Sequence, residues 1–429
     1  MTGPAGPHGG FALCLAAVLL CLALPASAAR IVAAQHGKSW AQTLRDMLLC
    51  ASFGAAAFFL VGSWLTFGAD AGGILGLPPG ASHPAPQADT LGAALFFLYH
   101  LGLCLVPFWM FYAVSGARLT RAGNALMCAV VCVFVFPVIG HWTIGYRWLG
   151  ASGAGWLAAR GFFDAAGGVA ALGCGAAAAL AGMLGGAAAG SPRDGAPTGD
   201  DSATTGGDGA APEGSGAGWQ IMLVSWLLAS AFSAGSSGGN FFGALAALIM
   251  GCFCGALAAK TVAVAAQAGA SAGLHWLVKL FRSQNRDFVQ WLGNLGPDEA
   301  VGLAAGAAAL SSGLTVAPWW AIPAIGALAG SLAWISLEFL GVVLGLTPLV
   351  RRVLALGLGG AIGAAFSGLV ALPQPSLFIN DMFVAGGVTL AGIELTGAAA
   401  TAAWTIAVVW LVQRGLLRAQ RALAALPEE

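Results

Sequence analysis

Few side chains in the long apolar stretches of this 429-residue sequence can carry a proton or bind an ion. They include two histidines, His100 and His141, and three carboxylic acids, Asp164, Glu338 and Glu394. Imidazole titrates near neutral pH, and a carboxylate inside an apolar span is a functional candidate by default. The sequence contains no phosphate-binding glycine loop, nucleophile elbow or His-Glu-x-x-His motif. It therefore does not predict an enzyme.

Three of these side chains also have a structural interpretation. Asp164 is placed to cap the helix that follows it by accepting backbone N–H groups. His141 is alone on an apolar segment, where a histidine is usually a hydrogen-bonded structural group. His100 either takes part in recruiting a substrate or extends its ring to the membrane interface.

The composition is that of an integral membrane protein. Hydrophobic residues make up 59% of the chain, charged residues only 8%, and the mean hydropathy is +0.84. Soluble domains carry about 25% charged residues. The formal net charge is zero, which argues against a nucleic-acid partner. The 65 glycines suit helices whose backbones approach closely or line a narrow path.

The nine cysteines indicate neither a disulfide framework nor a cofactor. Their odd number and apolar surroundings argue against disulfides. Cys252-Phe-Cys254 has no second pair with which to hold a metal. No metal and no cofactor are therefore expected.

Eleven apolar windows meet the length of about 20 residues that a membrane-spanning helix needs. They are residues 11–33, 45–67, 91–114, 122–144, 164–188, 219–237, 241–265, 298–316, 318–342, 353–373 and 386–412. The sequence thus predicts an all-α integral membrane protein that forms a single domain over residues 1–429.

The basic residues give these spans a direction. With the N-terminus outside, every lysine and arginine except Arg147 and Arg160 falls in or beside a loop on the inner side. Positive charge concentrates in cytoplasmic loops, so the N-terminus is predicted outside and the C-terminus inside. Glu394 then lies near the outer end of its span, where it is protonated or paired. Glu338 and Lys260 lie near inner ends and are expected at the interface.

Four segments carry their own predictions. Residues 189–217 are rich in Gly, Ser and Asp and predict a flexible cytoplasmic loop. Residues 279–297 predict an amphipathic interfacial connector, and residues 413–429 a cytoplasmic tail. Residues 1–29 are either a retained first span or a signal peptide with Ala-Ser-Ala at its cleavage site. The run has no Lys or Arg before it, which favours the retained span.

Several motifs follow one another along nearly the whole chain: FPVIGHWTIGYRWL (136–149), DAAGG (164–168), WLLASAFSAGSSGGN (226–240), ALGLGGAIGAAFSGLVA (355–371) and GVTLAGIELTGAAATAAW (387–404). In this order they resemble motifs of the ammonium transporter family, the Amt, Mep and Rh proteins. The family motifs include Ala-His-Trp-Val-Trp-Gly-Gly-Gly, Asp-Phe-Ala-Gly-Gly and Val-His-Gly-Val-Gly-Gly. The end of the predicted first span, PASAARIVAAQHGKS (25–39), fits the family without gaps.

The resemblance implies a homotrimer of eleven-helix protomers. Each protomer would have its own pore between two inverted five-helix halves, followed by a last helix. The implied activity is ammonium or ammonia transport without a cofactor, in contact with membrane lipid. The implied partner is a separate cytoplasmic nitrogen-regulatory signal protein. The high Gly and Ala content suggests a bacterial genome, and hence the inner (plasma) membrane.

Two pore histidines of the family are replaced in this sequence. In the family, one lies eight residues after the aspartate of Asp-Phe-Ala-Gly-Gly and the other just before Gly-Val-Gly-Gly. The matching positions are Leu172 and Leu356. Leucine cannot accept or relay a proton, and a pair of leucines makes a hydrophobic constriction. A charged ion would enter it only at a large desolvation cost.

The outer recruitment site of the family is also changed. Its second tryptophan, which would hold ammonium by a cation–π interaction, matches Ile144. Phe232 and Ser236 match a gate phenylalanine and a nearby serine. The resemblance implies that Asp164 is a structural and electrostatic anchor, and it matches His141 to the histidine of Ala-His-Trp.

The sequence therefore predicts a channel or transporter of this family that passes a neutral species. The alternative is a non-conducting sensor or binding protein that acts through a separate cytoplasmic partner.

Overall fold

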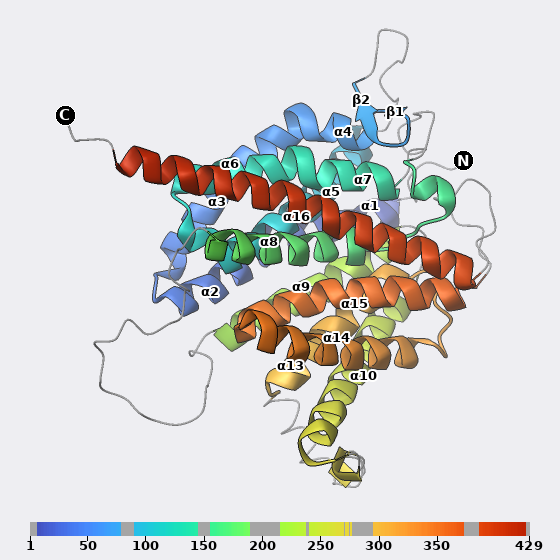
Figure 1. Ribbon diagram of the computed structural model, residues 1–429. Helices are drawn as coiled ribbons and strands as arrows, with labels where there is room; N and C mark the ends of the chain where they lie inside the picture. The colour runs from blue at the N-terminus through green and yellow to red at the C-terminus, as the bar shows by residue number, and fades with distance from the viewer. Residues whose placement is uncertain are drawn as a thin grey trace, which may run out of the picture.

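The computed structural model describes most of the chain. The described residues are 7–78, 90–144, 155–188, 215–236, 240–276 except 270 and 274, 295–372 and 386–425. Within them the chain is almost entirely helical (Figure 1). The predicted loop 189–217 and connector 279–297 lie almost wholly outside the described residues, so both remain predictions.

The first half of the chain contains α1 (Pro7–Val18), η1 (Leu19–Ala23), α2 (Leu24–His36), α3 (Trp40–Ala57), η2 (Phe58–Gly62), α4 (Ser63–Phe67), β1 (Ala69–Ala71), β2 (Leu75–Leu77), α5 (Thr90–Ser115), η3 (Gly116–Arg118), α6 (Arg121–Val130), η4 (Val131–Val135), α7 (Phe136–Ile144), η5 (Ala158–Arg160), η6 (Gly168–Gly173) and α8 (Cys174–Ala188). The second half contains α9 (Ser215–Ser236), α10 (Phe241–Ala268), α13 (Pro297–Gly313), α14 (Ile322–Leu344), α15 (Pro348–Val370) and α16 (Val388–Ala424). The π-helical turns η1, η2, η4 and η6 lie within longer helices.

Nine helical stretches among the described residues are long and apolar enough to cross a membrane. They correspond to nine of the eleven predicted spans. The other two windows, 219–237 and 298–316, coincide with α9 and α13, which are helical. Their described apolar parts are shorter than the other nine, so they remain predictions as spans. The helix α1–η1–α2 and the last helix α16 both run from right to left in Figure 1, as expected for an odd number of crossings.

The glycine- and alanine-rich helix formed by η6 and α8 is packed against α5, α15 and α16. Its glycines face side chains of these neighbours. A Cβ atom at Gly175 would collide with the sulfur of Met110, and one at Gly182 would lie 2.6 Å from Oγ of Ser115. Small residues let helices approach where no hydrophobic force drives them together. The run therefore serves close packing on several sides.

A second set of close contacts surrounds α13. This helix packs against α10, α14 and α15. A Cβ atom at Gly302 would collide with the backbone of Gly255, and one at Gly306 with the backbone of Gly251. Gly255 is also in contact with Gly330 of α14. Backbone meets backbone here, so these positions exclude any side chain.

Two details differ from the sequence-based prediction. The end of α4 is followed by a small antiparallel hairpin, β1–β2, in which Ala69 pairs with Leu77. The last helix does not end near residue 412 but continues to Ala424, through most of the predicted tail 413–429. At the other end of the chain, α1 and α2 pack against α9. Residues 1–29 as a retained first span, rather than a signal peptide, remain a prediction.

Candidate pore

Leu172 and Leu356 lie on two helical segments that contact each other directly. Leu172 belongs to η6 and Leu356 to α15. Each residue is only 3% exposed and is part of the main apolar core. Neither side chain has a polar atom, so neither can accept a proton.

Glycines and a serine set the distance between these segments. A Cβ atom at Gly360 would collide with the carbonyl group of Gly168. The hydroxyl of Ser312, on α13, donates a hydrogen bond to the carbonyl oxygen of Gly360 at 3.1 Å. The positions of the two leucines are therefore fixed by η6, α13 and α15 together.

Asp164 caps the helix that carries Leu172. Its Oδ2 atom accepts hydrogen bonds from the backbone nitrogens of Val169 at 3.0 Å and Ala170 at 2.7 Å. The first N–H groups of a helix have no partner within the helix, and a carboxylate there is also favoured by the helix dipole. This placement suits a structural and electrostatic anchor.

The residues after Asp164 attach this corner to α13. The backbone nitrogens of Ala165 and Ala166 donate to the carbonyl oxygens of Ser312 and Ser311, at 3.1 and 3.0 Å. The indole of Trp226, on α9, donates to the hydroxyl of Ser311 at 2.9 Å. The start of η6 is thus held in place by two other helices.

Glu394 of α16 is fully buried beside the same corner. Its Oε1 atom accepts a hydrogen bond from the backbone nitrogen of Phe163 at 2.9 Å. Its Oε2 atom has no hydrogen-bond partner among the described residues. The structure therefore brings Asp164 and Glu394 to adjacent positions, although 230 residues separate them in the sequence.

His100 lies inside a group of aromatic rings. Its ring centre is 4.0 Å from that of Phe96, 5.1 Å from Phe67 and 5.2 Å from Tyr99. Its Nδ1 atom is 2.9 Å from the carbonyl oxygen of Phe96, and the residue is 5% exposed. The ring is therefore buried rather than extended to the interface.

The predicted outer residues are placed only in part. Phe232 stacks on Phe241, with ring centres 4.5 Å apart and an angle of 26° between the planes. Ser236 and Ile144 are the last residues of α9 and α7, and their side chains lie outside the described part of the structure. The roles of all three remain predictions.

Sequence reasoning missed Tyr99 as a polar residue of this region. Its hydroxyl donates to Oγ of Ser233 at 2.8 Å, which joins α5 to α9 one residue from Phe232. The only signal was its position beside His100 in an apolar span.

His141 joins α7 to the hairpin and to the end of α4. Its Nδ1 atom is 3.0 Å from the carbonyl oxygen of Thr66, and its Nε2 atom is 2.9 Å from Oδ1 of Asp70. The residue is 1% exposed. Each ring nitrogen thus faces an oxygen acceptor, which is an arrangement that suits a structural role.

A line of buried polar residues on α16, also missed, continues from Glu394. Thr401, Thr405 and Gln413 lie on the buried face of the same helix. The hydroxyl of Thr405 is 3.4 Å from Sγ of Cys174 in α8. Spacings of seven, four and eight residues place the four side chains on one helix face, which is the signal that could have found them.

The arrangement combines hydrogen-bonding groups near one end with an apolar centre. Asp164, Tyr99 and Glu394 supply polar atoms, and Leu172 and Leu356 supply none. Among the described residues, no group of three or more His, Cys, Asp or Glu side chains is placed to hold a metal ion.

Comparison with known proteins identifies the fold. No protein-family model and no curated protein sequence matches the chain. Several solved structures are similar to it, of which three are described. A Sensor Amt Protein superposes with a TM-score of 0.72 at 17% identity, over 96% of this chain and 94% of that one. Candida albicans Mep2 has a TM-score of 0.67 at 19% identity, over 94% and 83%.

The third, Saccharomyces cerevisiae Mep2, has a TM-score of 0.65 at 16% identity, over 98% of this chain and 86% of that one. In the three superpositions the likeness covers 94–98% of this chain and 83–94% of the other chain. It agrees with the resemblance found in the sequence motifs. The chain is a multi-pass membrane protein with the fold of the Amt and Mep2 ammonium transporter structures.

Proposed function

We propose that the protein belongs to the ammonium transporter family and conducts ammonia, or another small uncharged molecule, across the membrane. The observation that carries this proposal is the pair of buried leucines, Leu172 and Leu356, on two helical segments in contact. An ammonium ion there would lose its hydration without gaining a partner. A neutral molecule does not meet that cost.

The remaining features of the proposal follow by analogy with the family, and a fold alone does not establish them. Phe232, Ser236 and Ile144 would line the outer part of the path. The protein would act as a homotrimer in the inner membrane of a bacterium, surrounded by lipid and without a cofactor. An enzymatic activity is not proposed.

Liposomes containing the purified protein test this proposal with two measurements on the same preparation. A pH dye inside the liposomes reports ammonia entry, because ammonia that enters takes up a proton and raises the internal pH. An electrode records any current across the liposome membrane. We expect ammonia entry above that of empty liposomes, and no ammonium-dependent current. The Leu172→His, Leu356→His double variant restores a proton acceptor and is expected to carry current.

A matched control places a histidine elsewhere on α15. Leu369 is 42% exposed on that helix, so the Leu369→His variant should behave like the wild type. An ammonium-dependent current in the wild-type protein would show that this path needs no imidazole and would end the neutral-species proposal.

The second candidate function is that of a non-conducting sensor. It is favoured by the similarity to a structure named Sensor Amt Protein, which the chain covers over 94% of its length. The partner would be a separate cytoplasmic protein, of the nitrogen-regulatory signal class. No ammonia entry in the wild type, together with current in the double variant and binding of such a protein to the full chain, would favour this candidate.

A further inference from the structure

The last turns of α9 are attached to α5 by a hydrogen bond between two side chains. The hydroxyl of Tyr99 donates to Oγ of Ser233 at 2.8 Å, which is the usual length of such a bond. The backbones of α5 and α9 hardly meet among the described residues, because η1 packs against both helices. The phenol ring therefore spans the space between two helices that backbone packing does not join.

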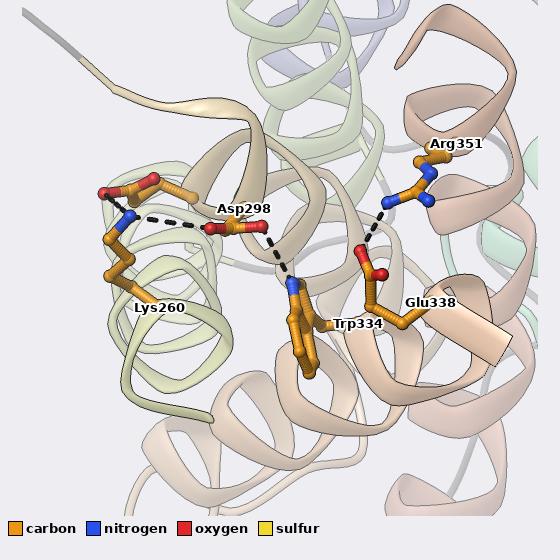
Figure 2. Close-up of polar contacts among 6 residues, drawn as sticks. Lys260, Asp298, Trp334, Glu338 and Arg351 are labelled. Carbon is orange, nitrogen blue, oxygen red and sulfur yellow. Dashed lines mark hydrogen bonds and ion pairs between the residues drawn. The ribbon is translucent and has the colours of Figure 1, made fainter. Parts of the chain in front are cut away.

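The helix ends predicted to face the cytoplasm are joined in a different way (Figure 2). Lys260 of α10 lies 3.5 Å from the carboxylate of Asp298 of α13, and the indole of Trp334 donates to the same carboxylate at 2.9 Å. Glu338 of α14 pairs with Arg351 of α15. Several charged contacts must break before one of these helices can move. The contact of Tyr99 with Ser233 is a neutral pair, so removing one hydroxyl group removes it.

Tyr99 itself is held firmly in α5. The residue is 7% exposed, and its ring centre lies 5.2 Å from that of His100, with the two planes at 90°. A phenylalanine at this position would keep the ring and this packing and would lose only the hydroxyl. Tyr99 is thus a fixed point for α9, and the effect of its hydroxyl can be tested separately from that of its ring.

The attached residue, Ser233, directly follows Phe232. Successive side chains of a helix point about 100° apart, so holding Ser233 against α5 fixes the direction of Phe232 as well. The ring of Phe232 stacks on Phe241, with ring centres 4.5 Å apart. Phe241 begins α10, where Oδ1 of Asn240 accepts hydrogen bonds from backbone nitrogens of the first turn. The ring is therefore placed by α10 directly and by α5 through Ser233.

We infer that Tyr99 is a positioning residue: its hydroxyl holds Ser233 and so fixes the Phe232 ring at a width that admits ammonia and excludes larger neutral amines. The inference rests on the proposed function, in which Phe232 lines the outer part of the path. Selection in a narrow apolar path depends on its diameter. Without the hydroxyl, the last turns of α9 can rotate about the helix axis, and the ring no longer holds the opening at one width.

Methylamine tests this inference, because it is ammonia enlarged by one methyl group. Liposomes containing the full-length protein and an internal pH dye report the entry of either amine, measured above empty liposomes. We expect the Tyr99→Phe variant to raise the ratio of methylamine entry to ammonia entry several-fold over the wild type. Both rates scale with the amount of folded protein, so partial loss of folding leaves the ratio unchanged.

Two further variants check the origin of the effect. Ser233→Ala removes the acceptor of the same hydrogen bond and should raise the ratio as much as Tyr99→Phe. The combined variant should show no more than either single change. Tyr112→Phe, the same substitution near the other end of α5, is the matched control and should keep the wild-type ratio. An unchanged ratio in Tyr99→Phe, or effects of the two changes that add, would overturn the inference.

A measurement that does not depend on transport separates this inference from the proposed function. A Phe232→Cys thiol is alkylated with a polar maleimide, and the nine native cysteines are measured as background in the chain without this change. We expect labelling to be several-fold faster when Tyr99→Phe is also present. If no amine enters above empty liposomes but the labelling rates differ, the proposed function fails and the positioning role of Tyr99 stands. Equal labelling rates would overturn the inference whether or not the protein conducts.

Discussion

Oε1 of Glu394 lies 2.9 Å from the backbone nitrogen of Phe163 and accepts its hydrogen bond. This contact joins the last helix of the chain to the corner that precedes η6, the segment carrying Leu172. Glu394 is completely buried, so water cannot replace the acceptor if the side chain is shortened. This carboxyl group therefore links α16 directly to the start of the candidate pore helix.

Substituting Glu394 tests this link. Glu394→Ala leaves the N–H group of Phe163 buried without a partner, and such a loss costs about 1–3 kcal/mol. We expect a lower midpoint of thermal unfolding in detergent, followed by tryptophan fluorescence. Glu394→Gln keeps an acceptor oxygen and should stay close to the wild type. Equal midpoints for the two variants would show that the hydrogen bond does not stabilise the fold.

Adding one methyl group at Gly168 tests the contact between η6, α13 and α15. A Cβ atom there would collide with the hydroxyl of Ser312 and lie 2.7 Å from the carbonyl oxygen of Ala308. Overpacking of this kind costs about 1–3 kcal/mol, so Gly168→Ala should lower the unfolding midpoint. Gly392→Ala is the matched control, because a Cβ atom at Gly392 meets nothing within 4 Å. If Gly392→Ala lowers the unfolding midpoint as much as Gly168→Ala does, the collision at Gly168 does not explain the loss of stability.

The pair His141 and Asp70 is expected to act as one unit. A double-mutant cycle with His141→Ala and Asp70→Ala should give a coupling energy within the range of about 0.5–3 kcal/mol found for residues in contact. The reference cycle uses Arg121 and Asp46, whose nitrogen and oxygen are 3.1 Å apart. Because the Arg121 side chain is 69% exposed, that pair should couple much more weakly. Additive effects at His141 and Asp70 would mean that the hairpin is held by other contacts.

The sequence predicted the membrane class and most helix positions because both depend on local composition. The many glycines predict helices that pack closely or line a narrow path, and the contacts of η6 and α8 with α5, α15 and α16 show close packing. The window 298–316 was also found, although α13 is short and rich in alanine and glycine. Such local signals need no knowledge of the rest of the chain.

The contacts around the candidate pore could not be predicted in the same way. Phe163 meets Glu394 over a separation of 231 residues, and Trp226 meets Ser311 over 85. His141 meets Asp70 only because a short hairpin turns the chain back toward α7. Side-chain partners of this kind depend on how helices assemble, which apolar periodicity does not encode.

The contacts between glycines of α10, α13 and α14 have a consequence for how the fold is specified. Where Gly255 faces Gly302 and Gly251 faces Gly306, the shape of the protein depends on the absence of side chains. No family model matches this chain. Superposition still aligns 96% of it with a solved structure at 17% identity. Superposition thus recognises the fold of this chain, whereas comparison with family models does not.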